Sequence, residues 1–466
     1  MKISVCRNCK SKKIKKIFSL GDIFFTGKFT KQNINPKRGP INVLMCKQCT
    51  LVQLGNNFDL KYLYGPDYGY RTGINKTMTE HVQNVVKIAS KITKLKKGDF
   101  VLDIASNDGT LLNFYDKNIT TFGIDPIINK FKKNYKKIDY KVSNFFSAKE
   151  IQKKINNKFK IITALSVFYD MLDPNKFLKD VENLLDPEGI IIIELADLGS
   201  IVKNNVFDTF CHEHLEYYNA KVIGEMAKKN GLRLFNIENN DINGGSLQFY
   251  LCKINSSYKT KNVSIKKYLN LEKRLKLYDE KTFVKFISNV NKIKNQLKSL
   301  ISNIYKKGQT IHGYGASTKG NVLLQYFNLT SKEIKYIAEK NPKKYGLYTP
   351  GSKIKIISER LSRKIKPNYY LVLPWHFKKE ILVREKQIRK KMDQLTVQFA
   401  KINSVEITST DKEEIIQTVA FQIVGSMEDA SNIFNIDIVI ILKKSYFQIA
   451  ISYRTNANDD YNESEH

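Results

Sequence analysis

The segment from residue 100 to 125 constrains the fold of this chain most strongly. An apolar strand, Phe100–Ile104, leads into small and turn-forming residues at 105–109, and we expect a helix to begin at Thr110. A second short strand, Thr121–Ile124, ends in the carboxylate of Asp125. In a doubly wound sheet such a turn lets the backbone approach a nucleoside, and an acid about twenty residues later binds two ribose hydroxyls. The segment therefore predicts a nucleoside site on an α/β sheet.

The turn lacks the glycines of a dinucleotide site. A pyrophosphate-binding turn reads G-x-G-x-x-G, whereas residues 103–109 read D-I-A-S-N-D-G and are too polar to cradle a pyrophosphate closely. The spacing suits S-adenosylmethionine, which contains a nucleoside but no phosphate. The alternative is an ordinary strand-to-helix turn.

Short apolar strands alternate with amphipathic helices from about residue 61 to 255. This alternation is typical of an α/β doubly wound sheet. The expected strands are Lys160–Ala164, Ile190–Glu194 and Leu247–Leu251, and the expected helices are Asn175–Leu185 and Ala220–Asn230, with a turn at residues 186–189. From about 262 to 306, apolar residues at helical spacing among many lysines predict one or two long solvent-facing helices.

A second α/β unit begins near residue 308. A strand at 310–314 enters a glycine-rich turn around Gly315 that opens a helix at Asn321–Phe327. Ser317, Lys319 and the backbone of this turn can offer N–H groups and a cation to a phosphate, although the turn is not a P-loop. Further strands are expected at Ile334–Ala338 and Tyr369–Leu373, the latter followed by Pro374, Trp375 and His376 at the edge where a pocket would lie.

Four of the six cysteines form two C-x-x-C pairs, namely Cys6 with Cys9 and Cys46 with Cys49. Each pair can form a tight knuckle, and two knuckles complete a tetrahedral thiolate shell for structural zinc. Disulfides are the alternative, but we expect a cytoplasmic protein, in which thiols stay reduced.

Composition sets the outer limits. The chain has 466 residues, enough for about three domains, and its hydrophobic content of 42% excludes disorder throughout. The formal net charge of +33 is compatible with a nucleic-acid partner, but the lysines are spread along the chain, which favours a compositional bias. From Lys391 to His466 there are six Lys or Arg and twelve Asp or Glu, a balance of −6. We expect strand-like runs at Ile436–Leu442 and Tyr446–Tyr453 in this tail, and disorder from Asn456 to His466.

Targeting signals are not visible. No run reaches the roughly eighteen apolar residues of a membrane span, and the first residues lack a signal-peptide core. We expect no membrane association. The expected domains are a zinc module (1–60), a cofactor-binding domain (61–255), a helical linker (256–307), a second Rossmann-like domain (308–391) and an appended acidic tail (392–466).

Titratable side chains are densest between Asp208 and Tyr218. This span follows a predicted strand and contains Cys211, His212, Glu213 and His214. Methylating an unactivated carbon requires a base that removes a proton next to a carbonyl, and donors that stabilise the enolate. A histidine suits the base, with a carboxylate fixing its tautomer. A metal bound by His212-x-His214 and a purely structural cluster are the alternatives.

These motifs together resemble those of sugar C-methyltransferases, which include the C-3 methyltransferases of deoxysugar biosynthesis. The two C-x-x-C pairs, the Asn107-Asp108-Gly109 loop, the sequence His212-Glu213-His214-Leu215 and the turn from Gly313 to Asn321 occur in that family's order. The resemblance spans residues 1 to about 390. It implies a zinc-binding N-terminal domain, a class I methyltransferase domain that binds S-adenosylmethionine, and a C-terminal Rossmann-like domain.

The resemblance also implies roles for particular residues. His214 matches the general base, Glu213 a neighbour that orients the substrate, and Tyr70 a tyrosine that faces the sugar. Asp103, Ala105, Ser106, Asn107, Asp108, Asp125, Asn144 and Phe145 would contact the cofactor. Tyr314, Ser317, Lys319, Asn321, Trp375 and His376 would hold a nucleotide-linked sugar or a similar small molecule.

Three departures from the family pattern stand out. Cys211 replaces an active-site tyrosine and Asp170 replaces a histidine, and the glycine-rich closing strand is missing after residue 390. We expect a methyltransferase that C-methylates a nucleotide-linked ketosugar and has no nucleic-acid partner. The alternatives are an RNA methyltransferase and a non-catalytic zinc-bearing scaffold.

Overall fold

The computed structural model describes all residues except 33, 66–67, 391–438, 444–447 and 452–466, and it describes only the backbone of residues 379, 386–390, 439–443 and 448–451. The chain divides into two compact units. Unit 1 comprises Met1–Thr30, Ile34–Ile201 and Thr209–Lys285, and unit 2 comprises Lys31–Asn33, Val202–Asp208 and Phe286–His466.

The main sheet of unit 1 has seven strands in the order β10-β11-β8-β7-β4-β5-β6. The five strands from β8 to β6 in this order are parallel, and β10 and β11 form an antiparallel hairpin beside β8. The strands are β4 (Phe100–Ile104), β5 (Thr120–Ile124), β6 (Tyr140–Val142), β7 (Phe159–Leu165), β8 (Leu185–Ala196), β10 (Leu232–Asn240) and β11 (Ser246–Lys253).

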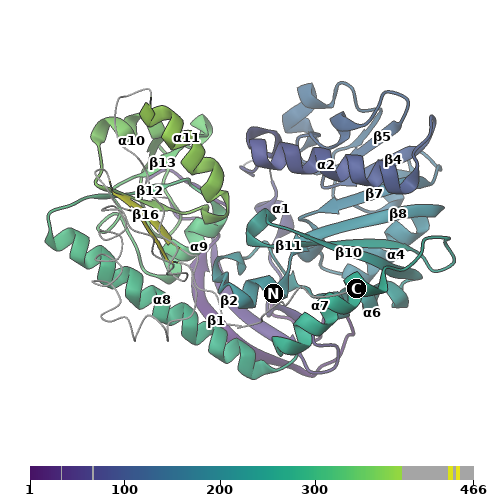
Figure 1. The fold of residues 1–466 in the computed structure, drawn as a ribbon, viewed down its shortest axis with the longest axis horizontal. Coiled ribbons are helices and arrows are strands. Elements are labelled where there is room, and N and C mark those ends of the chain that lie inside the picture. Colours follow the sequence, from purple (N-terminus) through teal and green to yellow (C-terminus); the bar gives the residue numbers. More distant parts are fainter. Residues whose placement is uncertain (33, 66–67, 391–438, 444–447, 452–466) are drawn as a thin grey trace, which may run out of the picture. The chain divides into compact units, whose positions relative to one another are not determined.

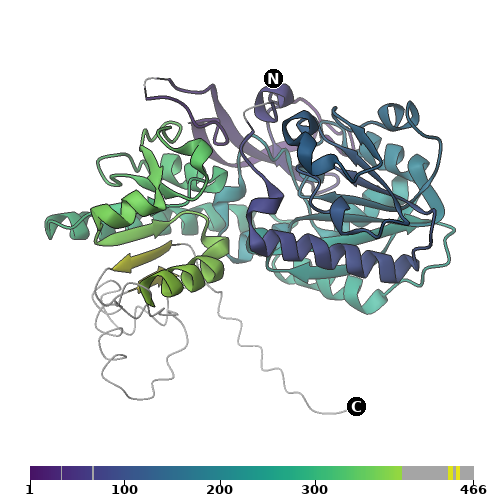
Figure 2. The ribbon, with the colours of Figure 1, turned by 90° about the horizontal axis from the view of Figure 1, so that it is seen from above.

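Helices cover both faces of this sheet, as Figures 1 and 2 show. On one face, Val82, Val85 and Val86 of α2 (Lys76–Thr93) pack into the same apolar cluster as Ile190 and Ile192 of β8. Burial on both faces explains why the central strands are continuous apolar runs. The opposite face carries α4 (Pro174–Leu184), α6 (Ala220–Lys229) and α7 (Asn262–Arg274); shorter helices are α1 (Leu60–Leu63), α3 (Ala148–Gln152) and α5 (Leu198–Lys203).

The strands expected in this region are confirmed, but two local predictions are wrong. Residues 186–189 do not form a turn before a strand, because β8 already begins at Leu185. No helix begins at Thr110; a single 3-10 turn, Leu112–Phe114, is present instead. The Asn113 amide donates to the Gly109 carbonyl at 2.7 Å and to the Asn134 carbonyl at 3.2 Å, and such side-chain bonds compete with helix formation.

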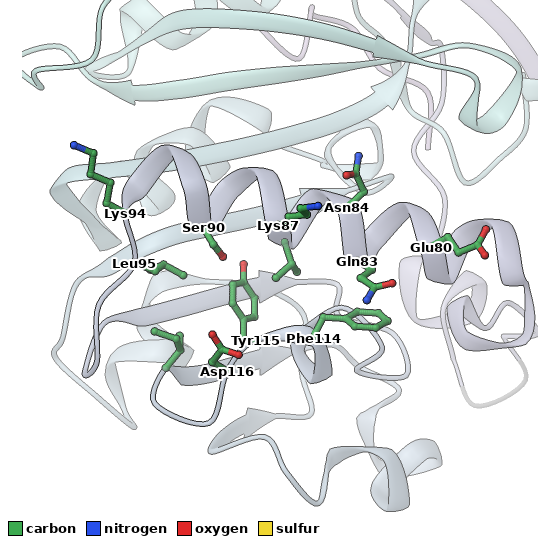
Figure 3. A pocket seen from close by; sticks show the side chains of 12 residues that line it. Glu80, Gln83, Asn84, Lys87, Ser90, Lys94, Leu95, Phe114, Tyr115 and Asp116 are labelled. Atoms are coloured by element: carbon green, nitrogen blue, oxygen red, sulfur yellow. The ribbon is translucent and has the colours of Figure 1, made fainter.

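The short connection between β4 and β5 leaves a groove beside α2. Side chains of α2, including Lys87, and of the connection, including Phe114 and Tyr115, line about 710 Å³ (Figure 3). The groove contains none of the residues predicted for the site.

The second sheet of unit 1 is built mainly from the N-terminal residues. It has the order β1-β2-β3-β9 and is antiparallel throughout. Its fourth strand, β9, comes from the segment that follows His214, so the sheet of the cysteine module includes the predicted catalytic segment. The strands are β1 (Ile14–Phe24), β2 (Arg38–Cys46), β3 (Val52–Leu54) and β9 (Glu216–Tyr217).

Unit 2 contains a six-stranded sheet in the order β14-β13-β12-β15-β16-β17. The first four strands are parallel, and β16 and β17 extend the edge in antiparallel fashion. The strands are β12 (Ile311–Tyr314), β13 (Ile337–Glu339), β14 (Ile356–Ser358), β15 (Tyr369–Val372), β16 (Val439–Lys443) and β17 (Gln448–Ile451); the helices are α9 (Thr318–Tyr326), α10 (Glu359–Ile365) and α11 (Lys378–Lys390).

Two sequence expectations bear on the remaining segments. The helices expected between 262 and 306 are α7 and α8 (Glu280–Lys306), but α8 buries one face through Val290, Ile293 and Leu297. Strand-like runs expected in the tail correspond to β16 and β17, whereas the rest of the predicted acidic tail, including Asn456–His466, lies outside the described residues. Within the described part of the chain, no helix combines the length and the apolar character needed to cross a bilayer.

Candidate active site

The predicted cofactor loop follows β4 at the carboxyl edge of the main sheet. Ala105 and Asn107 adopt left-handed backbone conformations, with φ of 58° and 52°. Non-glycine residues rarely do so, and such strained positions cluster at functional sites. The Asn107 amide donates to one Asp125 carboxylate oxygen at 2.9 Å, and the Ile127 amide donates to the other at 2.8 Å. The loop and the acid after β5 therefore form one preorganised turn.

A second loop, residues 70–73, closes onto this turn. The Asp108 carboxylate accepts hydrogen bonds from the Arg71 side chain at 2.9 Å and the Gly73 amide at 3.1 Å. The Asn107 side chain accepts from the Thr72 amide at 3.0 Å and donates to the Tyr70 carbonyl at 3.3 Å. Asp108 and Asn107 thus connect Tyr70, whose side chain is exposed, to the turn.

Asp103 and Asp125 supply the carboxylates of the turn. They are 5% and 6% exposed, and burial raises the pKa of Asp103 to about 7 and that of Asp125 to about 6. Asp103 accepts from the Thr163 hydroxyl at 2.6 Å. A carboxylate has about four acceptor positions, so both acids can accept further donors. The ribose hydroxyls and the ammonium group of S-adenosylmethionine are such donors, and the site fits this cofactor.

The remaining predicted cofactor residues lie around the same turn. The Ser106 hydroxyl bonds to the Tyr135 hydroxyl at 2.8 Å inside the sheet. Asn144 and Phe145 follow β6, the strand next to β5, and Ser143 bonds to the Pro126 carbonyl at 3.2 Å. This places residues 144 and 145 beside the segment that follows Asp125.

The N-terminal sheet holds the segment that carries His214. The Leu54 amide donates to the Leu215 carbonyl at 2.8 Å, and β9 pairs with β3. The buried Arg7 guanidinium donates to the Leu54 carbonyl at 2.7 Å and to the Leu215 carbonyl at 3.4 Å. Arg7 directly follows Cys6, and Leu215 directly follows His214. The hydrogen bond from Arg7 to the Leu215 carbonyl therefore connects the cysteine module to the predicted base.

The hydrogen bond of His214 selects its tautomer. Nδ1 lies 2.8 Å from the carbonyl oxygen of Thr209. A carbonyl only accepts, so Nδ1 carries the proton and Nε2 carries the lone pair. We expected a carboxylate in this role, whereas at Nδ1 the structure places a backbone carbonyl. The ring packs against Tyr169 with centroids 4.3 Å apart.

Acidic and phenolic groups surround His214. Glu213 is buried, its carboxylate accepts from the Thr26 hydroxyl at 3.4 Å, and burial raises its pKa. Asp170 is also buried, and burial raises its pKa well above the usual range. Burial, followed by the charges of Asp170, Tyr70, Glu213 and Asp125, raises the pKa of Tyr68. Tyr68 therefore lies within electrostatic reach of both the cofactor turn and the His214 cluster.

Cys211 and His212 are both fully buried in this segment. Burial raises the pKa of the Cys211 thiol, which bonds to Glu213. His212 donates through Nε2 to the Gly39 carbonyl at 3.1 Å, and its ring lies 4.2 Å from that of Phe25. Because His212 and His214 have separate partners, the alternative of a metal held by this pair finds no support; among the described residues the cysteine cluster alone has metal-binding geometry.

The four cysteines converge as predicted. Sγ of Cys6 lies 3.6 Å from that of Cys49, and Sγ of Cys9 lies 3.5 Å from that of Cys46. A zinc ion with Zn–S bonds of about 2.3 Å requires tetrahedral S···S distances of about 3.8 Å, so the cluster fits zinc, and a disulfide would need about 2.05 Å. The two knuckles also match in backbone: Lys10 and Thr50 follow the second cysteine of each pair with φ of 60° and 62°.

Unit 2 brings four of the six predicted substrate residues to one edge of its sheet. Ser317 and Lys319 follow β12, and Trp375 and His376 follow β15, the strand on the other side of β12 from β13. Ligands of open α/β sheets bind at such a switch point in strand order. The other two differ: the Tyr314 hydroxyl donates to Glu385 at 2.7 Å, and Asn321 is fully buried in α9.

A carboxylate that sequence reasoning did not select completes this edge. Asp208 is 2% exposed and accepts from the Trp375 indole at 2.8 Å, while its Oδ1 has no partner among the described residues. Burial raises the Asp208 pKa, which Lys319 partly offsets. Burial and then Lys319 lower the pKa of His376.

Sequence reasoning also missed Tyr68, Tyr169 and Thr209. Tyr68 and Tyr169 are single aromatic residues with no motif of their own. Thr209 acts through its backbone carbonyl, which no sequence pattern reveals. Only proximity in the chain to His214 could have suggested it.

The fold and the two built sites define a class I S-adenosylmethionine-dependent methyltransferase with a zinc-binding module. Three family models match: a zinc binding domain at residues 6–64, a methyltransferase domain at 75–236 and a C-methyltransferase C-terminal domain at 241–399. The chain matches all three models in this order, and it is an S-adenosylmethionine-dependent C-methyltransferase.

The chain is also similar to individual known proteins. C-methyltransferase NovU of Streptomyces niveus is 26% identical over 352 residues, which cover 75% of this chain and 83% of NovU. A methyltransferase from Clostridium acetobutylicum is 15% identical, with 38% of this chain and 92% of that chain covered and a TM-score of 0.31. The magnesium protoporphyrin IX methyltransferase of Synechocystis is 14% identical, with 40% and 90% covered and a TM-score of 0.30. These TM-scores are too low to bear on function.

Proposed function

We propose that this C-methyltransferase transfers a methyl group to a carbon next to a carbonyl in a nucleotide-linked sugar, with His214 as the general base. The observation that carries the proposal is the hydrogen bond from His214 Nδ1 to the Thr209 carbonyl. It leaves the basic lone pair on Nε2, in a segment that the N-terminal sheet holds in place.

The chain's own residues then have defined tasks. S-adenosylmethionine supplies an electrophilic methyl group when bound. His214 Nε2 removes a proton from the acceptor carbon, and the Thr209 carbonyl stabilises the resulting imidazolium through Nδ1–H. Glu213, anchored to Thr26 and Cys211, orients the sugar beside this ring. Tyr70 faces the acceptor from the loop that closes on the cofactor turn.

The cluster at the edge of the unit 2 sheet supports the nucleotide part of the substrate. Lys319 supplies a cation for a diphosphate, and its Nζ lies 6.0 Å from the centre of the Trp375 ring. The indole offers a stacking surface for a base, and the remaining oxygen of Asp208 offers an acceptor. Positive charge, an aromatic face and a buried acceptor suit a nucleoside diphosphate.

Mass spectrometry tests the proposal directly. Purified chain is incubated with S-adenosylmethionine and a panel of nucleoside-diphosphate ketosugars, with His214→Asn as the control. A product one methylene heavier, with the label on carbon when the donor methyl is ¹³C, is the expected result. Methylation of none of the panel, or only of oxygen, would overturn it. A gel-shift series with RNA across salt concentrations tests the alternative RNA substrate, whose binding would weaken steeply with salt.

A further inference from the structure

A buried charge interrupts an apolar stripe on β8. Ile190 and Ile192 face α2 and belong to one apolar cluster. The next residue on that face is Glu194, whose side chain is fully buried. The alternation along β8 calls for a third aliphatic residue there, and burying a carboxylate is costly unless it is paired. The position therefore needs an explanation beyond packing.

Glu194 is fully engaged with donors from three different elements. Its two carboxylate oxygens lie 2.9 and 2.8 Å from Nε2 of His81 on α2. Asn240 at the end of β10 donates at 2.8 Å, and Gln248 on β11 donates at 2.7 Å. Because the carboxylate accepts from Nε2–H, the functional nitrogen of His81 is Nδ1. Among the residues that the structure describes, Nδ1 has no hydrogen-bond partner, and the side chain is 10% exposed.

A chain of contacts at the end of β7 links this pair to the predicted base. Glu194 pairs in register with Leu165, the last residue of β7, and its carbonyl accepts from the Ser166 amide at 2.8 Å. Ser166, with φ of 56°, bonds through its side chain to Tyr169, whose ring packs on His214. Figure 1 shows α2, which carries His81, lying along this face of the sheet. The charges of Asp108 and Glu194 both act on the hydroxyl of Tyr70.

We propose that His81, held by Glu194, binds the carbonyl oxygen of the acceptor and stabilises the enolate. The inference rests on the proposed function, which leaves the donor to this oxygen unassigned. With Glu194 as counter-ion, a ring protonated on both nitrogens adds no net charge to the edge of the sheet. Glu194 is then a positioning residue, and His81 is the group that contacts the substrate.

The electrons and protons balance in this scheme. His214 Nε2 takes the proton from the acceptor carbon, the C–H electron pair forms the C=C bond of the enolate, and the π pair of the carbonyl moves onto its oxygen, which accepts a hydrogen bond from His81 Nδ1–H. When the carbon takes the methyl group, the carbonyl re-forms and the donor's sulfur keeps the electrons of the broken C–S bond. His81 keeps its proton, and His214 later releases its proton to water.

Two substitutions of His81 separate its nitrogens. In His81→Gln the amide can occupy the position of Nε2 and keep the bond to Glu194, but it removes the donor at Nδ1. In His81→Asn the amide lies near the position of Nδ1 and loses the bond to Glu194. Removing one donor to an oxyanion costs about 10²–10³-fold in kcat. We expect that loss in His81→Gln, a smaller loss in His81→Asn, and roughly a tenfold loss in Glu194→Gln, where the counter-ion becomes neutral.

Exchange of the acceptor's carbon-bound proton reports the enolate step without methyl transfer. The wild type is incubated in D2O with S-adenosylhomocysteine and a nucleoside-diphosphate ketosugar that it methylates. We expect His81→Gln to lose exchange and kcat together while its affinity for S-adenosylhomocysteine stays within twofold. His312→Gln is the matched control, because His312 is also buried and bonds to the Ser362 hydroxyl at 2.8 Å. It should lower the melting temperature and leave exchange per folded molecule unchanged.

Each outcome decides between explanations. Wild-type exchange and kcat in His81→Gln, with only a lower melting temperature, would overturn the inference and make the pair structural. Loss of S-adenosylhomocysteine affinity alone would mean that His81 and Glu194 act in cofactor binding, and it would also overturn the inference. If the wild type methylates and exchanges no ketosugar of the panel, the proposed function fails first and the assigned acceptor oxygen fails with it.

Discussion

Two turns in this molecule have the same hydrogen-bond arrangement around an acid and differ in the charges beside that acid. In unit 1 the acid after β5, Asp125, accepts from the Asn107 amide at 2.9 Å and from the Ile127 amide at 2.8 Å. In unit 2 the last residue of β13, Glu339, accepts from the Ala316 amide at 2.8 Å and from the Asn341 amide at 2.7 Å. In each unit the acid therefore bonds to the turn that precedes its strand and to the amide two positions further along the chain.

The difference lies beside the acid. Lys344 donates to the Ala316 carbonyl at 2.7 Å and lies 3.9 Å from the Glu339 carboxylate. No Lys or Arg among the described residues forms an ion pair with Asp125, and burial raises its pKa to about 6. The backbone differs as well: the first turn strains Ala105 and Asn107, whereas the second uses Gly315, with φ of 83°, where a Cβ would lie 2.6 Å from Pro374.

The charge beside each acid suggests different ligands for the two turns. An acid without a cation can accept ribose hydroxyls, so the first turn suits an adenosyl group. Lys344 lies 3.9 Å from the second acid and partly offsets its charge, so we expect no second adenosyl site at this turn. The cation that we propose for an anionic ligand of unit 2 is Lys319, near the start of α9. In the proposed function the first turn binds the methyl donor and unit 2 binds part of the acceptor.

The largest effect should come from substituting His214, because the proposed proton transfer and methyl transfer both take place in unit 1. His214→Asn keeps a donor near Nδ1 for the Thr209 carbonyl and removes the base at Nε2. We expect kcat to fall by about 10²–10⁴ while affinity for S-adenosylhomocysteine stays unchanged, measured by single-turnover kinetics and calorimetry. Full activity in this variant would remove His214 from the mechanism.

Zinc removal should affect unit 1 selectively. Arg7 joins the cysteine module to the Leu215 carbonyl, so loss of the knuckles should release the segment that carries His214. A chelator that extracts the zinc should abolish most turnover and lower the first unfolding transition, because structural zinc contributes directly to folding. Cys9→Ser should do the same. Cys252→Ser, which alters a buried cysteine outside the cluster, should retain zinc and activity. Turnover that persists after complete loss of zinc would mean that the cysteine module does not position His214.

Substituting the two acids in parallel tests the comparison itself. Asp125→Asn should weaken binding of S-adenosylhomocysteine by about 10–100-fold, because hydrogen bonds to a charged group contribute about 1.5–3 kcal/mol. Glu339→Gln should leave that affinity unchanged and lower only the stability of unit 2. Calorimetric titration of both variants decides. Weaker binding in Glu339→Gln would mean that the adenosyl group also uses the second turn.

Lys319→Met should produce a smaller and purely acceptor-specific change. Loss of one charge-assisted phosphate contact should raise the KM for a nucleoside-diphosphate ketosugar about tenfold. We expect kcat to stay within twofold, because the proposal gives Lys319 a role in binding the acceptor and none in proton transfer. Steady-state kinetics with Lys332→Met, an exposed lysine, provides the control. A large fall in kcat would contradict the assignment of all chemistry to unit 1.

Local patterns predicted the central strands and the cysteine knuckles well. The strand Phe100–Ile104 matches β4 at both ends, because strands covered on both faces are continuous apolar runs bounded by turn residues. The C-x-x-C spacing fixes each knuckle within a few residues. The helix expected from Thr110 failed because the Asn113 side chain bonds to the backbone of this turn.

Contacts between distant segments could not be predicted. Strand β9 has two residues and pairs with β3 across more than a hundred and fifty positions of sequence. His81 and Glu194 are separated by 113 residues, and neither lies in a motif. The tautomer of His214 depends on the Thr209 carbonyl, which every residue type would offer. Chemistry set by side-chain type was therefore visible in the sequence, whereas positioning set by backbone was not.

The smallest expected effect is a pH dependence confined to the first turn. We expect ionised Asp125 to accept the ribose hydroxyls, and burial raises its pKa to about 6. Below that pH a proton must leave Asp125 before the cofactor binds. The Kd for S-adenosylhomocysteine should therefore rise by up to tenfold for each unit by which the pH falls, and it should become constant toward pH 8. Asp103, with a pKa of about 7, extends the effect on binding to higher pH.

For folding the sign is opposite. The native acids hold protons that an unfolded aspartate, with a pKa of about 3.9, has lost. The unliganded chain should therefore lose stability as pH rises from about 4 to 7. Calorimetry from pH 5 to 8 checks the binding arm, and Asp125→Asn should leave only the part centred near pH 7. A Kd independent of pH in the wild type would mean that neither carboxylate of the first turn contacts the cofactor, and the contrast with the second turn would lose its basis.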